Sequence, residues 1–192
     1  EKVPVQAGIE LDVRYHENDL ILHHDPFHHH EQNPIKFEEL LMNWVHEGPM
    51  ILNVKTEGVE KKCIELMATH NISNWFFLDL SMPYFVMFSE YAQKGQLAHF
   101  SSQNLAVRFS EREPIEYACS FSGRVQWVWV DCFTRFPLTV EYYDRLKADG
   151  FKLCIVSPEL HHHSLSRIPE FKALLEGFDV DAVCTKRPDL WK

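Results

Sequence analysis

The chain lacks any apolar run that approaches the roughly 20 residues needed to cross a bilayer, and no signal peptide is visible. We therefore expect no membrane span. It also lacks C-x-x-C pairs. Its five cysteines are scattered, several of them in apolar, strand-like runs: Cys63, Cys119, Cys132, Cys154 and Cys184. This spacing argues against a disulfide framework and for reduced, buried thiols, which predicts a cytoplasmic protein.

Basic charge is scarce as well: 19 Lys and Arg residues face 28 Asp and Glu residues, for a net charge of -9. Because nucleic-acid backbones attract basic surfaces, wholesale nucleic-acid binding is not expected, and any phosphate must be held locally. Long linkers and low-complexity runs are also absent. With 45% apolar residues, the 192-residue chain can bury one substantial core, so we predict a single domain over residues 1–192.

Short apolar runs rich in β-branched and aromatic residues recur along the chain, separated mostly by stretches with helical spacing. The strand-like runs are Gly8 to Arg14, Pro49 to Lys55, Asn74 to Leu80, Asn104 to Ser110, Val125 to Asp131, Phe151 to Ser157 and Asp181 to Lys186. The helical stretches include residues 37–45, 59–70, 139–149 and 168–175. Repeated strand-then-helix units predict an α/β fold. Since no Gly-rich phosphate turn follows the first run, a (β/α)8 TIM-type barrel is favoured over an open sheet, with its first strand expected before Glu1.

Two carboxylates in the first run, Glu10 and Asp12, are two residues apart and therefore share one face of an extended strand. The next extended segment, Asp19-Leu-Ile-Leu-His-His-Asp-Pro26, brings His24 nearby. Paired carboxylates hold a hard divalent cation, and a histidine carries protons near neutral pH. The combination predicts metal-assisted phosphoryl chemistry, although a Glu-x-Asp pair alone is also typical of an ordinary polar strand face.

Polar residues also end the other predicted strands, where barrel active sites lie. They are Asn53, Lys55, Asp79, Arg108, Ser110, Glu111, Asp131, Ser157, Glu159, Thr185 and Lys186. Among them we assign Arg108, Asp131 and Lys186 to substrate binding. We add Trp129, which shares a strand face with Asp131, although packing is the favoured interpretation of that ring. Ion pairing of Lys55 with Glu57 or Asp79, and of Arg108 with Glu111, is the structural alternative.

Two histidine tracts, His28-His29-His30 and His161-His162-His163, look like metal sites. Consecutive residues cannot all face one ion in regular structure, so we interpret both tracts as solvated loops. His23 precedes His24 directly, so its side chain points to the opposite face of an extended segment, and we interpret it as structural.

The Glu10-x-Asp12 pair, the following His24-Asp25 and the strand ending in Asn53-x-Lys55 resemble the glycerophosphodiester phosphodiesterase superfamily. This resemblance implies a (β/α)8 barrel, a phosphodiester of a glycerol-like or lipid alcohol as substrate, and Mg2+ or Ca2+ held by carboxylates. It implies that Glu10 and Asp12 are metal ligands. It also implies that His24 is one of two catalytic histidines, with Lys55 near the phosphate.

The chain departs from this family in two places. The family's first histidine lies in a His-Arg-Gly-type motif, which no residues before Gly8 match. Asn53 stands where the family usually has an acidic residue. Its amide oxygen can ligate a hard cation but adds no charge, so we expect weaker metal binding.

The expected activity is a metal-dependent phosphodiesterase acting on a small glycerophosphodiester-like substrate. The cation would bind a non-bridging phosphate oxygen, Lys55 and Arg108 would offset charge, and a histidine would protonate the leaving alkoxide. Two alternatives stay open. One is a metal-dependent carbon–carbon lyase acting on an oxo acid, which predicts indifference to His24→Ala. The other is a catalytically silent barrel that binds a phosphorylated ligand.

Overall fold

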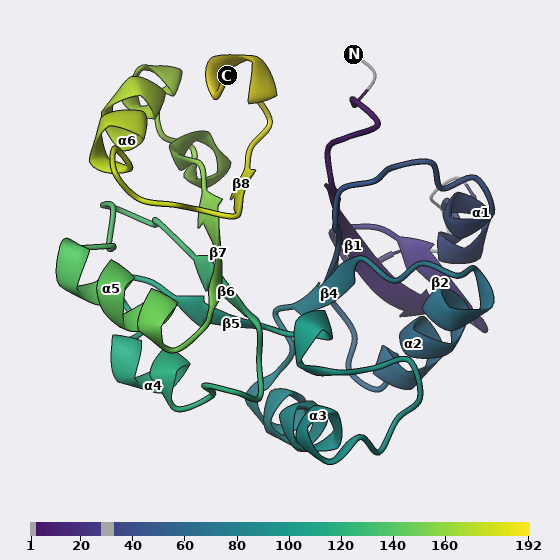
Figure 1. The fold of residues 1–192 in the computed structure, drawn as a ribbon. Coiled ribbons are helices and arrows are strands. Elements are labelled where there is room, and N and C mark those ends of the chain that lie inside the picture. The colour runs from purple at the N-terminus through teal and green to yellow at the C-terminus, as the bar shows by residue number, and fades with distance from the viewer. Residues whose placement is uncertain (1–2, 28–32) are drawn as a thin grey trace. The chain divides into compact units, whose positions relative to one another are not determined.

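The computed structural model describes residues 3–27 and 33–192 of the chain. The chain forms two compact units, Glu1–Leu105 and Ala106–Lys192. Each unit contains one four-stranded sheet accompanied by helices (Figure 1). Both units therefore have an α/β architecture.

The sheet of the first unit has the strand order β2-β1-β3-β4. Its strands are β1 (Ile9–His16), β2 (Asp19–Leu22), β3 (Met50–Val54) and β4 (Trp75–Leu78), and its helices are α1 (Phe37–Met42), α2 (Glu60–Thr69), α3 (Met82–Lys94) and the 3-10 helix η1 (Ser102–Asn104). β1, β3 and β4 are parallel, whereas β2 pairs antiparallel with β1. A left-handed residue, Glu17 (φ 53°), turns the chain between β1 and β2.

Local sequence accounts for these elements. Every residue of β3 and β4 is buried, as expected for largely apolar strands of a parallel sheet covered on both faces. Helix α3 has a proline in its first turn, where the missing N–H costs nothing, and ends at Gly95 in the left-handed conformation (φ 60°).

Two glycines let β1 and β3 approach each other at the start of their pairing. A Cβ on Gly8 would lie 2.3 Å from the carbonyl oxygen of Pro49, and a Cβ on Gly48 would lie 2.2 Å from the backbone nitrogen of Gly8. Side chains at these positions would push the strands apart. The close approach allows the Ile9 N–H to donate to Pro49 at 3.1 Å, which begins the β1–β3 register.

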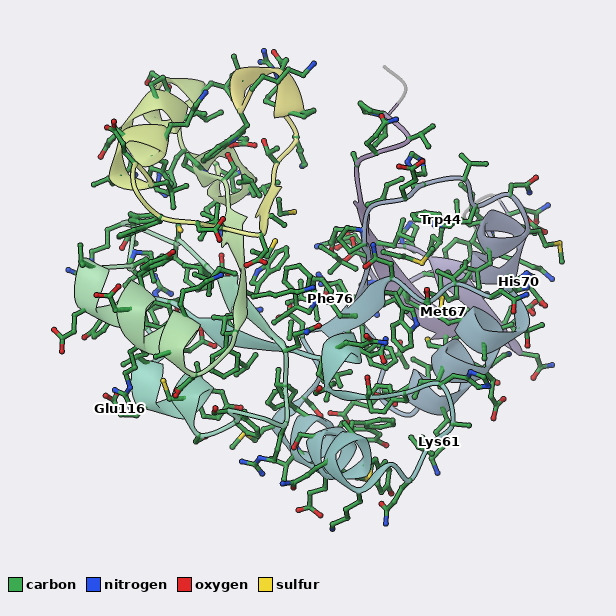
Figure 2. The ribbon with its side chains drawn as sticks, in the orientation of Figure 1. Trp44, Lys61, Met67, His70, Phe76 and Glu116 are labelled. Atoms are coloured by element: carbon green, nitrogen blue, oxygen red, sulfur yellow. The ribbon has the colours of Figure 1, made fainter. Side chains whose placement is uncertain are left out.

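The core of the first unit is rich in aromatic rings. The Phe77 side chain is 0% exposed, and its ring centroid lies 5.0 Å from Trp75, 6.3 Å from Phe88 and 6.2 Å from Phe100. On the other face of β4, Phe76 is buried, as is Met67 of α2; Figure 2 labels both residues. These rings supply much of the apolar area that stabilises the first unit.

The sheet of the second unit is parallel throughout, in the order β5-β6-β7-β8. Its strands are β5 (Ala106–Phe109), β6 (Trp127–Val130), β7 (Lys152–Val156) and β8 (Ala182–Cys184). Its helices are α4 (Ile115–Cys119), α5 (Val140–Ala148) and α6 (Ile168–Leu174), with 3-10 helices η2 (Pro158–His161), η3 (Leu165–Arg167) and η4 (Pro188–Leu190). Thr139 caps α5 by accepting a hydrogen bond from the Tyr142 N–H.

Each of the seven predicted strands overlaps a strand of the structure, with β1 extending two residues beyond its predicted end, and each of the four helical stretches contains a helix. The α/β prediction is therefore confirmed. Among the described residues the strands form two four-stranded sheets, and no closed sheet is seen. All five cysteines are free thiols, with Cys63, Cys132 and Cys154 buried. Within the described ranges, every helix is too short or too polar to cross a bilayer.

Candidate functional site

Three polar side chains meet on two neighbouring strands of the first unit. In the parallel β1–β3 register Asp12 lies beside Asn53, and Glu10 lies two residues earlier on β1. The Nδ2 of Asn53 donates a 2.9 Å hydrogen bond to Oε1 of Glu10. The structure thus brings together Glu10, Asp12 and Asn53, the residues that the sequence suggested as metal ligands.

Lys55 adds a positive charge to this group. Its backbone N–H donates to the carbonyl of Val13 at 2.9 Å, which extends the β1–β3 pairing by one step. Its Nζ lies 3.3 Å from Oδ1 of Asp12, with the two side chains 21% and 20% exposed. Asp12 is therefore an ion-pair partner of Lys55 that the sequence alternatives, Glu57 and Asp79, did not include.

Two oxygens of this group fit a cation. Oδ1 of Asp12 and Oδ1 of Asn53 are buried, and neither accepts a hydrogen bond from the described residues, although the Asp12 oxygen has the ion pair with Lys55. The amide orientation of Asn53 follows from Glu10, because rotation would turn the amide oxygen toward the carboxylate. A buried acceptor without a donor among the described residues, such as Oδ1 of Asn53, costs free energy, which a bound cation would relieve.

The donor types also suit a hard ion. Carboxylate and amide oxygens are the ligands that Mg2+ and Ca2+ take in proteins, often with water completing the shell. In the part of the chain that the structure describes, no three His, Cys, Asp or Glu side chains are grouped as a metal site. The amide of Asn53 is therefore essential to the fit, because Glu10 and Asp12 are the only two carboxylates in the predicted ligand set.

The surroundings of the Glu10 carboxyl shift its pKa upward. Burial raises its pKa above the ordinary value of 4.5, and the hydrogen bond from Asn53 opposes that shift. The charges of Asp12 and Asp79 raise the pKa further, whereas Lys55 lowers it. A cation bound here would favour the ionised carboxylate.

The raised pKa predicts a pH-dependent stability. The folded pKa of Glu10 exceeds its unfolded value, so its stabilising contribution is complete below the unfolded pKa and is lost as the pH rises through the folded pKa. In metal-free protein we therefore expect Glu10→Gln to increase the free energy of unfolding near pH 7, with no such gain near pH 4. Urea denaturation with a chelator present measures this difference.

The exposed Glu57 offers a matched control. Glu57→Gln should change the stability little at either pH, because a solvated carboxylate pays no burial cost. Equal stability of wild type and Glu10→Gln near pH 7 would contradict the assigned cost of burying the Glu10 charge.

His24 lies in the segment after β2, and its side chain is 72% exposed. Its Nδ1 lies 3.0 Å from Oδ1 of Asp25. The backbone carbonyl of His24 accepts two hydrogen bonds from Arg14, from Nε at 3.1 Å and from Nη2 at 2.9 Å. The structure therefore fixes the backbone of His24, while its ring faces solvent beside Asp25.

Arg14 was not among the predicted site residues. Besides His24, its guanidinium donates to the carbonyl of Lys55 at 3.3 Å, so it ties the segment after β2 to the segment after β3. The sequence could have identified Arg14, because residues 10, 12 and 14 alternate along the strand, so that Arg14 lies on the same face as Glu10 and Asp12.

His23 has structural contacts, as its parity predicted. Its backbone N–H donates to the Asp12 carbonyl at 3.0 Å, and its ring packs edge-on against Phe27 with centroids 5.4 Å apart. The tract His28-His29-His30 lies outside the described residues.

The four predicted substrate-binding residues belong to the second unit. Arg108 on β5 pairs in register with Trp129 on β6, whose side chain is buried. Asp131 directly follows β6 and is also buried, with Arg108 Nε 3.7 Å from its Oδ2. Lys186 follows β8, and its backbone N–H donates to Glu159 at 3.0 Å while the residue is exposed.

The prediction of a solvated loop at residues 161–163 is wrong for two of the three histidines. The ring of His161 contacts the carboxylate of Asp131, and Nε2 of His163 hydrogen-bonds to the carbonyl of Phe133 at 2.8 Å. His162 is exposed. The 3-10 helix η2 turns the tract so that alternate histidines face the protein, which composition alone did not reveal.

Comparison with known proteins gives a likeness in structure alone. Neither the protein-family models nor the curated proteins searched contain a match. A crystal structure of a Galdieria sulphuraria protein, provisionally assigned as a glycerophosphodiester phosphodiesterase, superimposes with a TM-score of 0.67 at 14% identity. The match covers 96% of this chain and 84% of that chain. The two proteins share a fold.

Proposed function

We propose that this chain is a metal-dependent phosphodiesterase that hydrolyses a glycerophosphodiester-like or related phosphodiester. The observation that carries the proposal is the register that sets Asp12 beside Asn53, with one buried oxygen of each accepting no hydrogen bond from the described residues. The fold shared with the Galdieria sulphuraria protein supports it. We also propose that residues 1–192 form one (β/α)8-type barrel domain, as that likeness along the chain suggests.

In this proposal Glu10, Asp12 and Asn53 would hold Mg2+ or Ca2+, which would supply charge neutralisation to a bound phosphodiester. Lys55 supplies a further positive charge, and its ion pair with Asp12 keeps its Nζ at this group of residues.

His24 is the proposed proton carrier. With Nδ1 directed at Asp25, its Nε2 is the ring nitrogen left to take a proton from the attacking water, a step that every phosphodiester substrate requires. Arg14 fixes the backbone at this residue, which limits where the exposed ring can reach. In the second unit we propose Arg108 and Lys186 as contacts for the anion. Trp129 and Asp131, both buried, would shape that region.

Turnover of bis(p-nitrophenyl) phosphate tests the proposal. We expect release of p-nitrophenolate only with added Mg2+ or Ca2+ and none with a chelator. His24→Ala should lower kcat by at least about 100-fold, because general acid–base catalysis typically contributes 10²–10⁴-fold. His99→Ala, at an exposed histidine of the same unit, is the control and should retain activity.

The lyase alternative gives the opposite pattern. It predicts cleavage of an oxo acid, no phosphodiester turnover and no effect of His24→Ala. Turnover that persists in the chelator and in His24→Ala would remove the phosphodiesterase assignment as stated.

A further inference from the structure

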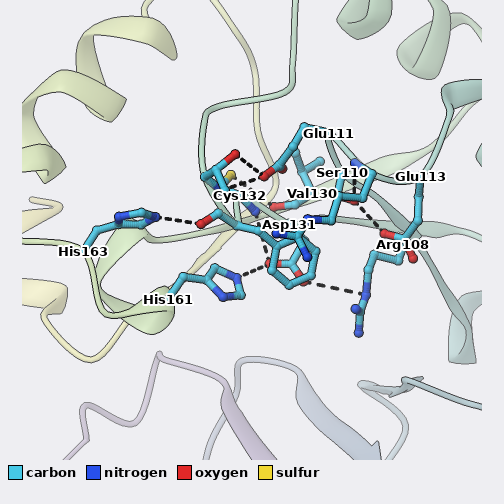
Figure 3. Close-up of polar contacts among 12 residues, drawn as sticks. Arg108, Ser110, Glu111, Glu113, Val130, Asp131, Cys132, His161 and His163 are labelled. Atoms are coloured by element: carbon cyan, nitrogen blue, oxygen red, sulfur yellow. Dashed lines mark hydrogen bonds and ion pairs between the residues drawn. The ribbon is translucent and has the colours of Figure 1, made fainter.

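A buried carboxylate in the second unit holds a histidine that the proposed mechanism does not yet use. The side chain of Asp131 is 5% exposed, and its Oδ1 contacts Nε2 of His161 (Figure 3). The same Oδ1 accepts a 3.1 Å hydrogen bond from the Cys132 N–H, while Arg108 Nε lies 3.7 Å from Oδ2. Because a desolvated carboxylate needs such partners, Asp131 holds the imidazole in one orientation.

The His161 ring is fixed on a second side and still reaches solvent. It packs against Phe133 with ring centroids 4.6 Å apart, and its side chain is 23% exposed. The Nε2–H points to Asp131, so the neutral ring carries its lone pair on Nδ1. Among the described residues no hydrogen bond to this Nδ1 is found. An imidazole held by a carboxylate through one nitrogen and open at the other is the arrangement used for proton transfer.

Neighbouring His163 shows what an anchoring histidine looks like on the same segment. Its Nε2 bonds to the Phe133 carbonyl at 2.8 Å, and its Nδ1 lies 3.4 Å from Nη1 of Arg167. Both ring nitrogens are engaged by the protein. His161, by contrast, has a hydrogen bond to the described residues at Nε2 alone. A role in attaching η2 to the sheet does not explain why its Nδ1 stays open.

Two positively charged side chains lie over the aromatic ring that packs on His161. The guanidinium groups of Arg108 and Arg112 lie over the Phe133 ring at 5.8 and 5.2 Å, the same ring that packs on His161. This charge favours an anionic substrate such as a phosphodiester. Arg108 comes from β5, Asp131 follows β6 and His161 follows β7, so the group lies at the carboxyl ends of three parallel strands, where α/β folds bind ligands.

We propose that His161 is the general-acid catalytic residue for phosphodiester hydrolysis, with Asp131 as its positioning residue; this rests on the proposed function. The oxygen of the attacking water forms the new P–O bond, and its proton passes to a base, the role left to His24. The P–O bond to the alcohol breaks, its electron pair goes to the alcohol oxygen, and that oxygen takes the proton from Nδ1 of the His161 imidazolium, which solvent then protonates again. The products are a phosphomonoester and an alcohol, and the imidazolium is stabilised throughout by Asp131.

Two substrates with different leaving groups test this role. Glycerophosphocholine releases an alcohol that must be protonated, whereas bis(p-nitrophenyl) phosphate releases a stable phenolate. We expect His161→Gln to lower kcat on glycerophosphocholine by at least about 100-fold, and on the aryl diester by a clearly smaller factor. His163→Gln and His162→Gln are the matched controls, and neither should change the ratio of the two rates.

Asp131→Asn tests the positioning role. It should lower kcat on glycerophosphocholine with little change in KM, because the amide no longer selects the reactive tautomer or stabilises the imidazolium. Circular dichroism checks that each variant is folded. A fall in KM and kcat that His163→Gln reproduces would instead indicate a loop-anchoring role and overturn the assignment.

The two proposals fail in distinguishable ways. If wild type hydrolyses both diesters and His161→Gln keeps the wild-type kcat, or loses the same factor on both, only the role of His161 is contradicted. If wild type hydrolyses neither diester with Mg2+ or Ca2+, the proposed function itself fails, and the role of His161 in it fails as well.

Discussion

Glu10→Gln is expected to lose at least about 100-fold of the metal-dependent phosphodiesterase turnover, the usual cost of removing one electrostatic contributor to catalysis. The substitution keeps the shape of the side chain and the acceptor for the Asn53 amide, whose 2.9 Å hydrogen bond a glutamine oxygen can still receive. It removes one of the two carboxylate charges in the proposed ligand set. Initial rates at several Mg2+ concentrations measure the effect.

The same variant separates loss of function from loss of folding. Since burial raises the pKa of Glu10, its replacement should stabilise the metal-free protein near neutral pH while abolishing turnover. A folded, more stable and inactive variant would show that this carboxylate is retained at a cost to stability. Glu57→Gln should match wild type in rate, and wild-type rates in Glu10→Gln would contradict the assigned role.

Phe77→Ala is expected to reduce the free energy of unfolding by about 3–5 kcal/mol, the range for large-to-small aromatic substitutions in cores. Phe77 is fully buried on β4 and packs against Trp75, Phe88 and Phe100, from β4, α3 and the segment before η1. Removing the ring leaves a cavity bordered by rigid aromatic neighbours, which close only partly. Urea denaturation followed by circular dichroism measures the change.

Met42→Ala is the control for this prediction, because Met42 is an exposed apolar residue on α1 of the same unit. It should cost well under about 1 kcal/mol, as most surface substitutions do. A similar cost for both variants would mean that the aromatic cluster does not dominate the stability of the first unit.

The strands were predictable because a strand that is buried on both faces consists of a nearly continuous run of apolar residues. The runs that became β3, β4 and β6 are almost entirely apolar and of strand length, so their position followed from hydrophobicity alone. Helix α3 was not singled out, because residues such as Tyr84, Val86 and Phe88 have strand-like propensities that tertiary packing overrides.

The sequence predicted the parts of the candidate site that depend on the alternation of side chains along one strand. It did not predict the parts that depend on which residues of two strands lie side by side. Alternation put Glu10 and Asp12 on one face of β1, and the same rule would have added Arg14. The Asp12–Lys55 ion pair depends on the β1–β3 register, which the close approach of Gly8 and Gly48 helps to set. No local pattern reveals such a register.

The contact between Asp131 and His161 also could not be predicted from the sequence. The two residues are 30 positions apart, and the 3-10 helix that orients His161 gives no periodic signal. Consecutive histidines suggested equivalent residues, whereas the structure gives each of the three a different environment.

Titration of metal-free protein with Mg2+ and with Ca2+ in a calorimeter tests most directly whether Glu10, Asp12 and Asn53 hold a divalent cation. We predict one site in wild type that is lost or strongly weakened in Glu10→Gln and in Asp12→Asn, and retained in Glu57→Gln. Binding of equal affinity in wild type and both site variants, or no binding of either ion to wild type, would contradict the account.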